Sequence, residues 1–427
     1  MMTDSETSSY PVEIAKALRE CWAADGYMAA ALPADAALVL LIDMMYQASL
    51  LREEGESVQC RIIVAPPEAF APTLAWGAGE VNVLPFAEAR ALTPHELRKL
   101  AAAAGYYRAL LAVHVSAKGA PLIWGMVVTG TKWVNRFGGD RFDEAPLPPH
   151  LVLQILAPGH LIAASGYTRV LESAGGKLLR EGFDPFQSGW LSERFHPLRS
   201  ALLAELKESL PDSGATRICE SFVKDVAQSV FRRVLSLVRT RGHGGMLVLL
   251  PTEAGGRAMI DQWFRFRVRF AEDDSALWFH TLLIRLMKRV LELGSALGLA
   301  VCTWNDYRRM HDAELAELDD ALIGFGHFLA DLMSVDGALV LEQYFRLVGF
   351  GGEILGENHV AQIHRALDLE AERSIAEAAD SSGTRHRAAY RFVNGTRDAI
   401  AVVVSQDGDV RFVAHHNGKL VYWPYLP

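Results

Sequence analysis

The sequence is short of cysteine, of long apolar runs and of positive charge. Its 427 residues contain four cysteines, and none of them form a CxxC pair; they are Cys21, Cys60, Cys219 and Cys302. Four scattered thiols exclude a disulfide framework and a zinc site of the CxxC type, and they favour a reducing cytoplasm. The polar start, MMTDSETSSY, lacks the basic and apolar parts of a signal peptide. We therefore expect a cytoplasmic protein without a membrane segment.

The charge balance limits the kinds of ligand that the chain can hold. The formal net charge is -9, which excludes a general electrostatic grip on DNA or RNA, so a nucleic-acid partner is not expected. Any phosphate ligand must be held by a local cluster of donors. With 50% hydrophobic and 22% charged residues, the chain is globular and long enough for about two or three domains.

Familiar catalytic motifs are also missing. There is no HExxH, GxSxG or protein-kinase set. The run GFGGEILG at 349–356 is rich in glycine but lacks GxGxxG spacing, so it is not a dinucleotide fingerprint. His243 lies between glycines before an expected strand, where a turn histidine is favoured over a metal ligand.

The first half of the chain has the pattern of a compact α/β module. Apolar residues at helical spacing follow residue 11, and CRIIVA at 60–65 predicts a strand. Thr93 is placed to cap a helix over 93–105, and a meander or hairpin is expected around Lys118 and Gly119. The aromatic side chains of this half are expected in its core rather than in a ligand pocket; they include Trp76, Trp124 and Trp133.

The second half repeats helix and strand patterns that predict a mixed sheet flanked by helices. A turn-rich stretch at 184–198 suggests the boundary, giving domains at 10–195 and 196–427. The Ala- and Glu-rich residues 357–380 are expected to form an extra helix. Helices are expected at 222–237, 275–293 and 313–333, and strands at 246–250, 337–342, 399–405 and 410–414, with a turn at 407–409.

Two short stretches carry the chemistry. In VDGALVL at 335–341, Asp336 follows a helix at a turn, and Gly337 and Ala338 keep the surface small enough for a flat base or sugar. In GTRHRAA at 383–389, backbone NH groups fall at a helix N-terminus beside three potential anion donors, which are Arg385, His386 and Arg387.

A metal-binding carboxylate opposite a phosphate cradle is the minimal equipment for phosphoryl or nucleotidyl transfer. A structural protein whose basic triplet is merely a solvated helix end remains the alternative, which ATP binding would exclude.

DGA and RHR, in that order and in these contexts, resemble the catalytic domain of bacterial and archaeal diadenylate cyclases. The resemblance covers about 205–427 with an insertion around 256–315, and residues 10–195 resemble the sensor modules that precede this domain in some bacterial proteins. It implies an α/β fold in which a sensor-like module is followed by a cyclase domain. It also implies that two ATP are condensed into cyclic di-AMP, with release of two pyrophosphates, between facing protomers of a homo-oligomer.

The resemblance further implies a divalent metal, Mg²⁺ or Mn²⁺, and assigns residues to roles. Asp336 would bind the metal and activate the ribose 3′-hydroxyl, and it would share catalysis with Arg385, His386 and Arg387. The residues implied to bind ATP are Gly337, Ala338, Ile354, Gly383, Thr384 and Ser405.

Some departures from the family pattern leave alternatives open. Val335 and Gln406 stand where some members carry His and Glu as metal ligands, so the full ligand set is undetermined. A catalytically silent sensor of ATP or a cyclic dinucleotide could use the same fold. The first domain could read an unknown ligand, or it could serve only packing or dimerisation.

Overall fold

The computed structural model divides the chain into two compact units, with the described residues up to Leu179 in the first and those from Asp184 onward in the second. No helix in the described part of the chain is long and apolar enough to cross a membrane. The structure describes residues 11–70, 81–105, 109–115, 119–129, 147–174, 176–179, 184–209, 216–250, 256–356, 359–406 and 408–425.

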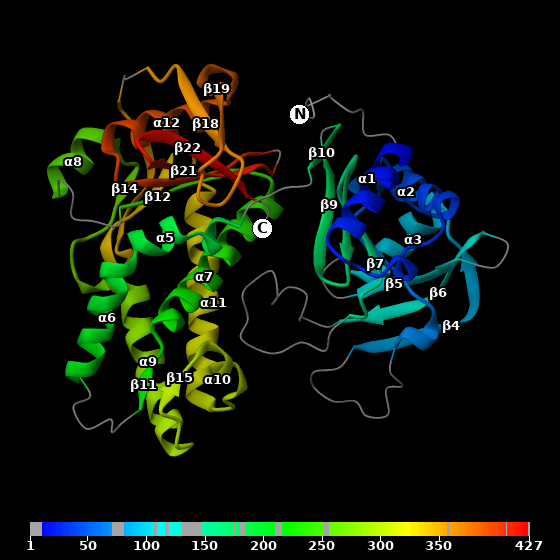
Figure 1. Ribbon diagram of the computed structural model, residues 1–427, viewed down its shortest axis with the longest axis horizontal. Helices are drawn as coiled ribbons and strands as arrows, with labels where there is room; N and C mark the ends of the chain where they lie inside the picture. The colour runs from blue at the N-terminus through cyan, green and yellow to red at the C-terminus, as the bar shows by residue number, and fades with distance from the viewer. Residues whose placement is uncertain are drawn as a thin grey trace. The chain divides into compact units, whose positions relative to one another are not determined.

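The first unit is built on a mixed sheet with the strand order β10-β9-β8-β7-β3-β5-β6-β4. Its helices pack their apolar residues onto one face of this sheet (Figure 1). The helices are α1 (Pro11–Ala24), α2 (Asp35–Ser49) and α3 (Pro94–Ala104). The strands are β3 (Cys60–Val64), β4 (Asn82–Ala91), β5 (Ala109–Val115), β6 (Pro121–Val128), β7 (Leu151–Ala157), β8 (His160–Ser165), β9 (Thr168–Ala174) and β10 (Lys177–Leu179), with a separate pair of β1 (Arg52–Glu53) and β2 (Glu56–Ser57).

Several local predictions for this unit are confirmed. The strand expected at 60–65 is β3, and the Thr93 hydroxyl accepts a hydrogen bond of 3.1 Å from the Glu96 amide at the start of α3. β5 and β6 pair antiparallel, as expected for a hairpin. Trp124 is buried. Lys118, Trp76 and Trp133 lie outside the described residues.

The second unit contains a larger mixed sheet with the order β13-β17-β16-β12-β20-β21-β22-β18-β19, while β14 also pairs with β17. Its helices are α5 (Gly189–Arg194), α6 (His196–Ser209), α7 (Glu220–Arg241), α8 (Gly256–Trp263), α9 (Trp278–Ala296), α10 (Trp304–Arg309), α11 (Ala313–Met333) and α12 (Thr384–Thr396). The strands are β12 (Gly245–Leu249), β13 (Phe264–Arg265), β14 (Val268–Arg269), β16 (Ala338–Leu341), β17 (Leu347–Ile354), β18 (Gln362–Ala366), β19 (Ser374–Ala378), β20 (Ile400–Val404), β21 (Val410–His416) and β22 (Lys419–Tyr425), with a short parallel pair of β11 (Arg217–Ile218) and β15 (Val301–Cys302).

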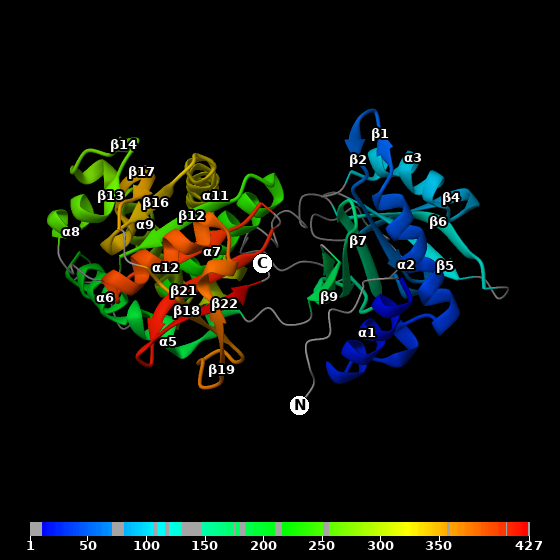
Figure 2. The same cartoon turned by 90° about the horizontal axis from the view of Figure 1, so that it is seen from above.

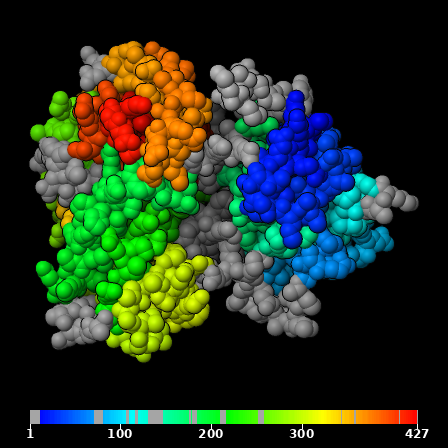
Figure 3. Space-filling model, in the orientation of Figure 1, coloured from blue at the N-terminus to red at the C-terminus, as the bar shows by residue number. Residues whose placement is uncertain are grey.

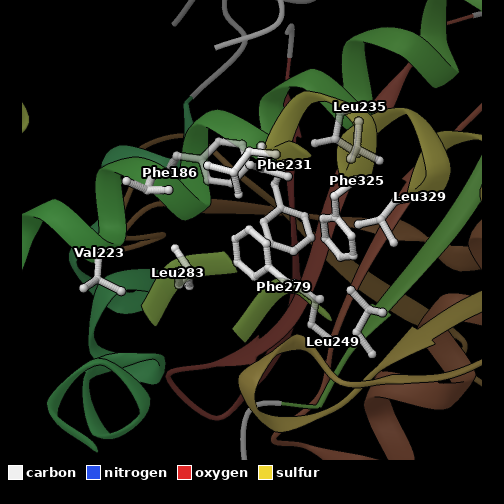
Figure 4. Close-up of a cluster of buried hydrophobic side chains, with 14 of the residues drawn as sticks. Phe186, Val223, Phe231, Leu235, Leu249, Phe279, Leu283, Phe325 and Leu329 are labelled. Atoms are coloured by element: carbon white, nitrogen blue, oxygen red, sulfur yellow. The ribbon is translucent and has the colours of Figure 1, made fainter. Parts of the chain in front are cut away.

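Alternate residues of the central strands enter two different cores. Leu247 and Leu249 of β12 pack with the side chains of α7, α9 and α11, whereas Met246 and Val248 pack with α12. In the first core the rings of Phe279 and Phe325 stack at 5.1 Å between centroids, and Figure 4 shows them beside Phe231. The sheet is therefore covered on both faces, and α12 is the helix that covers the strands leading to the candidate site (Figure 2).

The division between the units falls earlier than the expected boundary at 195/196. Phe186 packs edge-on against Phe412, and Trp190 of α5 stacks on Trp423 at 4.3 Å. Arg194 donates hydrogen bonds to the carbonyls of Arg397 and Asp398 at the end of α12. The turn-rich composition of 184–198 suggested a linker, but its aromatic side chains bury against the second unit. The functional limits of the two domains stay a prediction.

The extra helix expected at 357–380 is wrong. The described part of this segment forms β18 and β19, and β18 pairs parallel with β22. Ile363 and Ala366 are each 1% exposed. Pairing and burial at the sheet edge outweigh the helix preference of Ala and Glu. Figure 3 shows this segment and the last strands as one continuous orange and red surface.

Candidate active site at the start of strands β12 and β16

The two predicted stretches meet at one edge of the large sheet. β12 and β16 are parallel neighbours, so both begin at this edge, and β20 is antiparallel to β12, so it ends here. Asp336 precedes β16, and Ser405 follows β20. The edge thereby collects residues that are far apart in the sequence.

The contact that joins the two stretches is an ion pair. Arg385 Nη2 donates a hydrogen bond of 2.8 Å to Asp336 Oδ1 across 49 positions of the chain. The Asp336 side chain is 95% exposed, and that of Arg385 is 32% exposed. The carboxylate therefore faces solvent, where a ligand can reach it.

The start of α12 offers backbone donors to an anion. Gly383 is the N-cap residue, and as a glycine it brings no side-chain cap to the first amides of the helix. Gly383, Thr384 and Arg387 are exposed there. Free amides and the positive end of the helix dipole favour negative charge, and two arginines within the first turn strengthen that preference. The helix start predicted from the sequence is confirmed.

His386 does not share this exposure. Its side chain is 7% exposed and lies on the same helix face as Ala389, Tyr390 and Val393. Burial, together with the positive charge of Arg411, lowers the pKa of His386 to about 4, although Asp409 opposes the shift. The expectation of three side-by-side anion donors is thus corrected to two, because the helical period turns the middle residue inward.

The other residues predicted to bind ATP lie in different parts of the second unit. Ala338 is 1% exposed and packs in the core beneath α12, so its side chain does not form the expected surface. Ile354 is the last residue of β17 and pairs with Phe264. The Ser405 hydroxyl accepts a hydrogen bond of 3.0 Å from the Asp409 amide, which closes the turn after β20.

Gly337 is needed by the fold itself. It has a φ of 109°, and a β-carbon added there would come within 2.6 Å of the Gly351 carbonyl carbon and 2.8 Å of the Gly352 nitrogen. The glycines of β17 therefore allow this strand to lie close to the start of β16. This structural role agrees with the expectation that the run is not a dinucleotide fingerprint.

Gly244 borders the site and was missed in the sequence. A β-carbon there would lie 3.0 Å from Arg385 Nη1 and 2.8 Å from the Val404 carbonyl oxygen. The preceding His243 is exposed in the same turn between α7 and β12. The glycines around His243 were a signal for a close backbone approach, but nothing in the sequence related them to Arg385 and Val404, which lie much later in the chain.

The arrangement fits a divalent metal that is held jointly with a nucleotide. Within the described ranges, no three His, Cys, Asp or Glu side chains gather into a complete metal site. Mg²⁺ characteristically takes one or two protein carboxylates and completes its shell with phosphate oxygens and water. Asp336 is such a carboxylate, because Arg385 occupies only one of its oxygens.

Comparison with known families gives the class of each unit. The family model described as "Probable sensor domain DACNV" matches residues 27–128, and the model described as "DisA bacterial checkpoint controller nucleotide-binding" matches residues 350–418. The two matches agree in kind and in order with the predicted sensor domain followed by a diadenylate cyclase-type nucleotide-binding domain. The second match includes Arg385 and Ser405 but begins after Asp336.

Whole-chain comparisons add little to these family matches. No curated protein matches the chain. Among solved structures, the chain is similar to a hypothetical membrane spanning protein from Bacillus cereus, with 12% identity, a TM-score of 0.24, and coverage of 56% of this chain and 93% of the other.

Burial of neutral His386 predicts a loss of stability in acid. The folded pKa of about 4 lies below the ordinary value of 6.5, so the unfolded chain binds the proton more tightly. The part of the free energy of unfolding that comes from neutral His386 is fully present above pH 6.5 and declines as the pH falls toward 4. At pH 5 the loss is about 2 kcal/mol. Denaturant unfolding of wild type and His386→Gln at pH 8 and pH 5 should show a smaller pH dependence in the variant. Equal pH dependence would contradict the buried neutral state.

Proposed function

We propose that the second unit is a diadenylate cyclase that condenses two ATP into cyclic di-AMP and two pyrophosphates. The observation that carries this proposal is the 2.8 Å contact between Arg385 and Asp336, which unites the two predicted stretches at one exposed edge. The match to a DisA-type nucleotide-binding domain supports a nucleotide as the ligand.

The residues at this end of the sheet have different roles in the proposed site. Arg385, Arg387 and the first amides of α12 bind the triphosphate, and Ser405 lies at the neighbouring turn. Gly337 lets β17 lie close to the start of β16 beside Asp336, and Gly244 leaves room for the Arg385 guanidinium. His386 supports the helix from its buried side and does not touch phosphate.

The reaction forms two phosphodiester bonds. In each half, a ribose 3′-hydroxyl oxygen attacks the α-phosphorus of the other ATP, the bond to the β-phosphate oxygen breaks, and pyrophosphate leaves. Asp336 orients the hydroxyl and accepts its proton. When bound, Mg²⁺ or Mn²⁺ would be held by Asp336 and the phosphates, and it would offset negative charge on the triphosphate. Arg385 neutralises Asp336 until the nucleotide arrives.

The proposed reaction requires a second protomer. One site holds one ATP, and its hydroxyl needs a phosphorus presented by a facing copy, which the exposed position of Asp336 permits. Product formed per protomer should therefore fall when the protein is diluted. The first unit, as a sensor domain, would bias this encounter.

The test is the conversion of ATP by the purified full-length chain. We expect cyclic di-AMP, detected by mass spectrometry, with Mg²⁺ or Mn²⁺, and a loss of at least about 100-fold in Arg385→Ala/Arg387→Ala. Arg373→Ala is the matched control, because Arg373 is 76% exposed beside Asp368 on the connection between β18 and β19. Bound ATP without product in wild type would instead favour a silent nucleotide sensor.

A further inference from the structure

Arg411 of β21 contacts the segment that leads into α12. Its Nη1 donates hydrogen bonds to the Tyr390 hydroxyl at 2.9 Å and to Ser382 Oγ at 3.3 Å. Ser382 directly precedes the N-cap residue Gly383, and Tyr390 lies on the second turn of the helix. One guanidinium group thus binds both the residue before the N-cap and the second turn of the helix that presents Arg385 and Arg387.

The same side chain also holds the turn that carries Ser405. Arg411 Nε donates to Asp409 Oδ2 at 2.8 Å, and the Asp409 amide donates to Ser405 Oγ at 3.0 Å. The Ser405 amide in turn donates to the Asp409 carbonyl at 2.8 Å. The two parts of the candidate phosphate cradle, α12 and the turn after β20, are therefore joined through one arginine.

The Tyr422 ring lies against the Arg411 guanidinium. The guanidinium carbon lies 4.5 Å from the centre of the Tyr422 ring, and the Tyr422 hydroxyl donates to Glu377 at 2.7 Å. Arg365 donates to the other oxygen of Glu377 at 2.8 Å. Burial alone would lower the pKa of Arg411, but Asp409, Tyr390 and Tyr422 raise it above its usual value, so the guanidinium stays charged.

We infer that Arg411 is a positioning residue for the phosphate cradle, which sets the distance between the first turn of α12 and the Ser405 turn. This inference rests on the proposed function. Arg411 is only 22% exposed, and its Nε and Nη1 donate to protein groups, so it acts through its neighbours rather than on ATP. A planar fork that serves three acceptors at once cannot be replaced by the single ammonium of lysine.

Arg411→Lys and Arg411→Met in the full chain test this role, with Arg365→Gln as the matched control. Arg365 is an arginine of the same sheet that lies farther from the cradle on β18, where it donates to Glu377 of β19. We expect the KM for ATP to rise at least about tenfold in both Arg411 variants, with a smaller change in kcat. The control should retain the wild-type KM.

Two readouts do not depend on turnover. Amide hydrogen exchange at residues 384–387 and 408–409 should be faster in both Arg411 variants than in Arg365→Gln. In Arg411→Met the pKa of His386, followed by NMR, should rise above about 4, because one of the charges that depress it is gone. Unchanged exchange in the Arg411 variants would overturn the inference, whereas absence of product from wild type would overturn the proposed function instead.

Discussion

Asp336→Asn is expected to reduce formation of cyclic di-AMP by about 10²- to 10³-fold without unfolding the protein. Asparagine keeps the shape of the side chain but removes the charge that would hold the metal and the oxygen that would accept the hydroxyl proton. Mass spectrometry measures the loss of product, and thermal shift measures separately whether ATP still binds.

The stability of the variant follows from exposure. The Asp336 side chain is 95% exposed, and an ion pair at such a position contributes at most about 1 kcal/mol to folding. A loss of product would therefore reflect the site and not the fold. If Asp336→Asn retained wild-type product formation, Asp336 would have no catalytic role.

Asp331→Asn provides the matched control. Asp331 lies on α11, is 63% exposed, and pairs with Arg241 at 2.6 Å, so it is a second exposed aspartate in an arginine ion pair. It stands five positions before Asp336 in the chain but outside the candidate site. We expect Asp331→Asn to retain wild-type activity, and an equal loss in both variants would indicate a general effect of removing surface charge.

The sequence predicted the elements around the site well, because they depend on local signals. The apolar period of α11 and the short run ALVL fix the helix and strand on either side of Asp336. Gly383 followed by Thr384 marks the start of α12. Such signals act within a few residues and survive in almost any tertiary context.

Other features depended on tertiary contacts that no local pattern encodes. His386 is buried because the face of α12 that carries it lies on the sheet. In the sequence, the basic neighbours on either side of it obscured the helical period that turns it inward. The strands β18 and β19 form because β22 offers an edge for pairing. The position of Gly244 beside Arg385 requires the parallel pairing of β12 with β16, which brings the starts of two distant segments together.

Hydrogen bonds from α5 link residues near the division between the units to α12, the helix that presents Arg385. Glu370, on the connection between β18 and β19, accepts hydrogen bonds from the amides of Gly189 and Trp190 at 2.7 and 3.3 Å and so caps the start of α5. Arg194 then reaches the carbonyls at the end of α12. The chain just after the division between the units is thereby connected to the C-terminal end of the helix whose N-terminal end presents Arg385.

Gly337→Ala is expected to lower the free energy of unfolding of the second unit by about 2–4 kcal/mol and to abolish product formation. Gly337 has a φ of 109°, which L-residues rarely adopt. The added methyl group would also lie 2.6 Å from the Gly351 carbonyl carbon, so β17 must separate from the start of β16. That shift would displace Asp336, the adjacent residue.

Gly324→Ala is the opposite case and the control for Gly337→Ala. Gly324 lies within α11 and is exposed, and among the described residues no atom beyond its own helical turns lies within 4 Å of an added β-carbon. Alanine there should raise the free energy of unfolding by about 0.5–1 kcal/mol, because it favours the helix over the unfolded chain. Urea unfolding of both variants measures the difference in sign. A Gly337→Ala protein as stable as wild type would contradict the close approach of β16 and β17, and one that is destabilised yet fully active would separate that approach from the site.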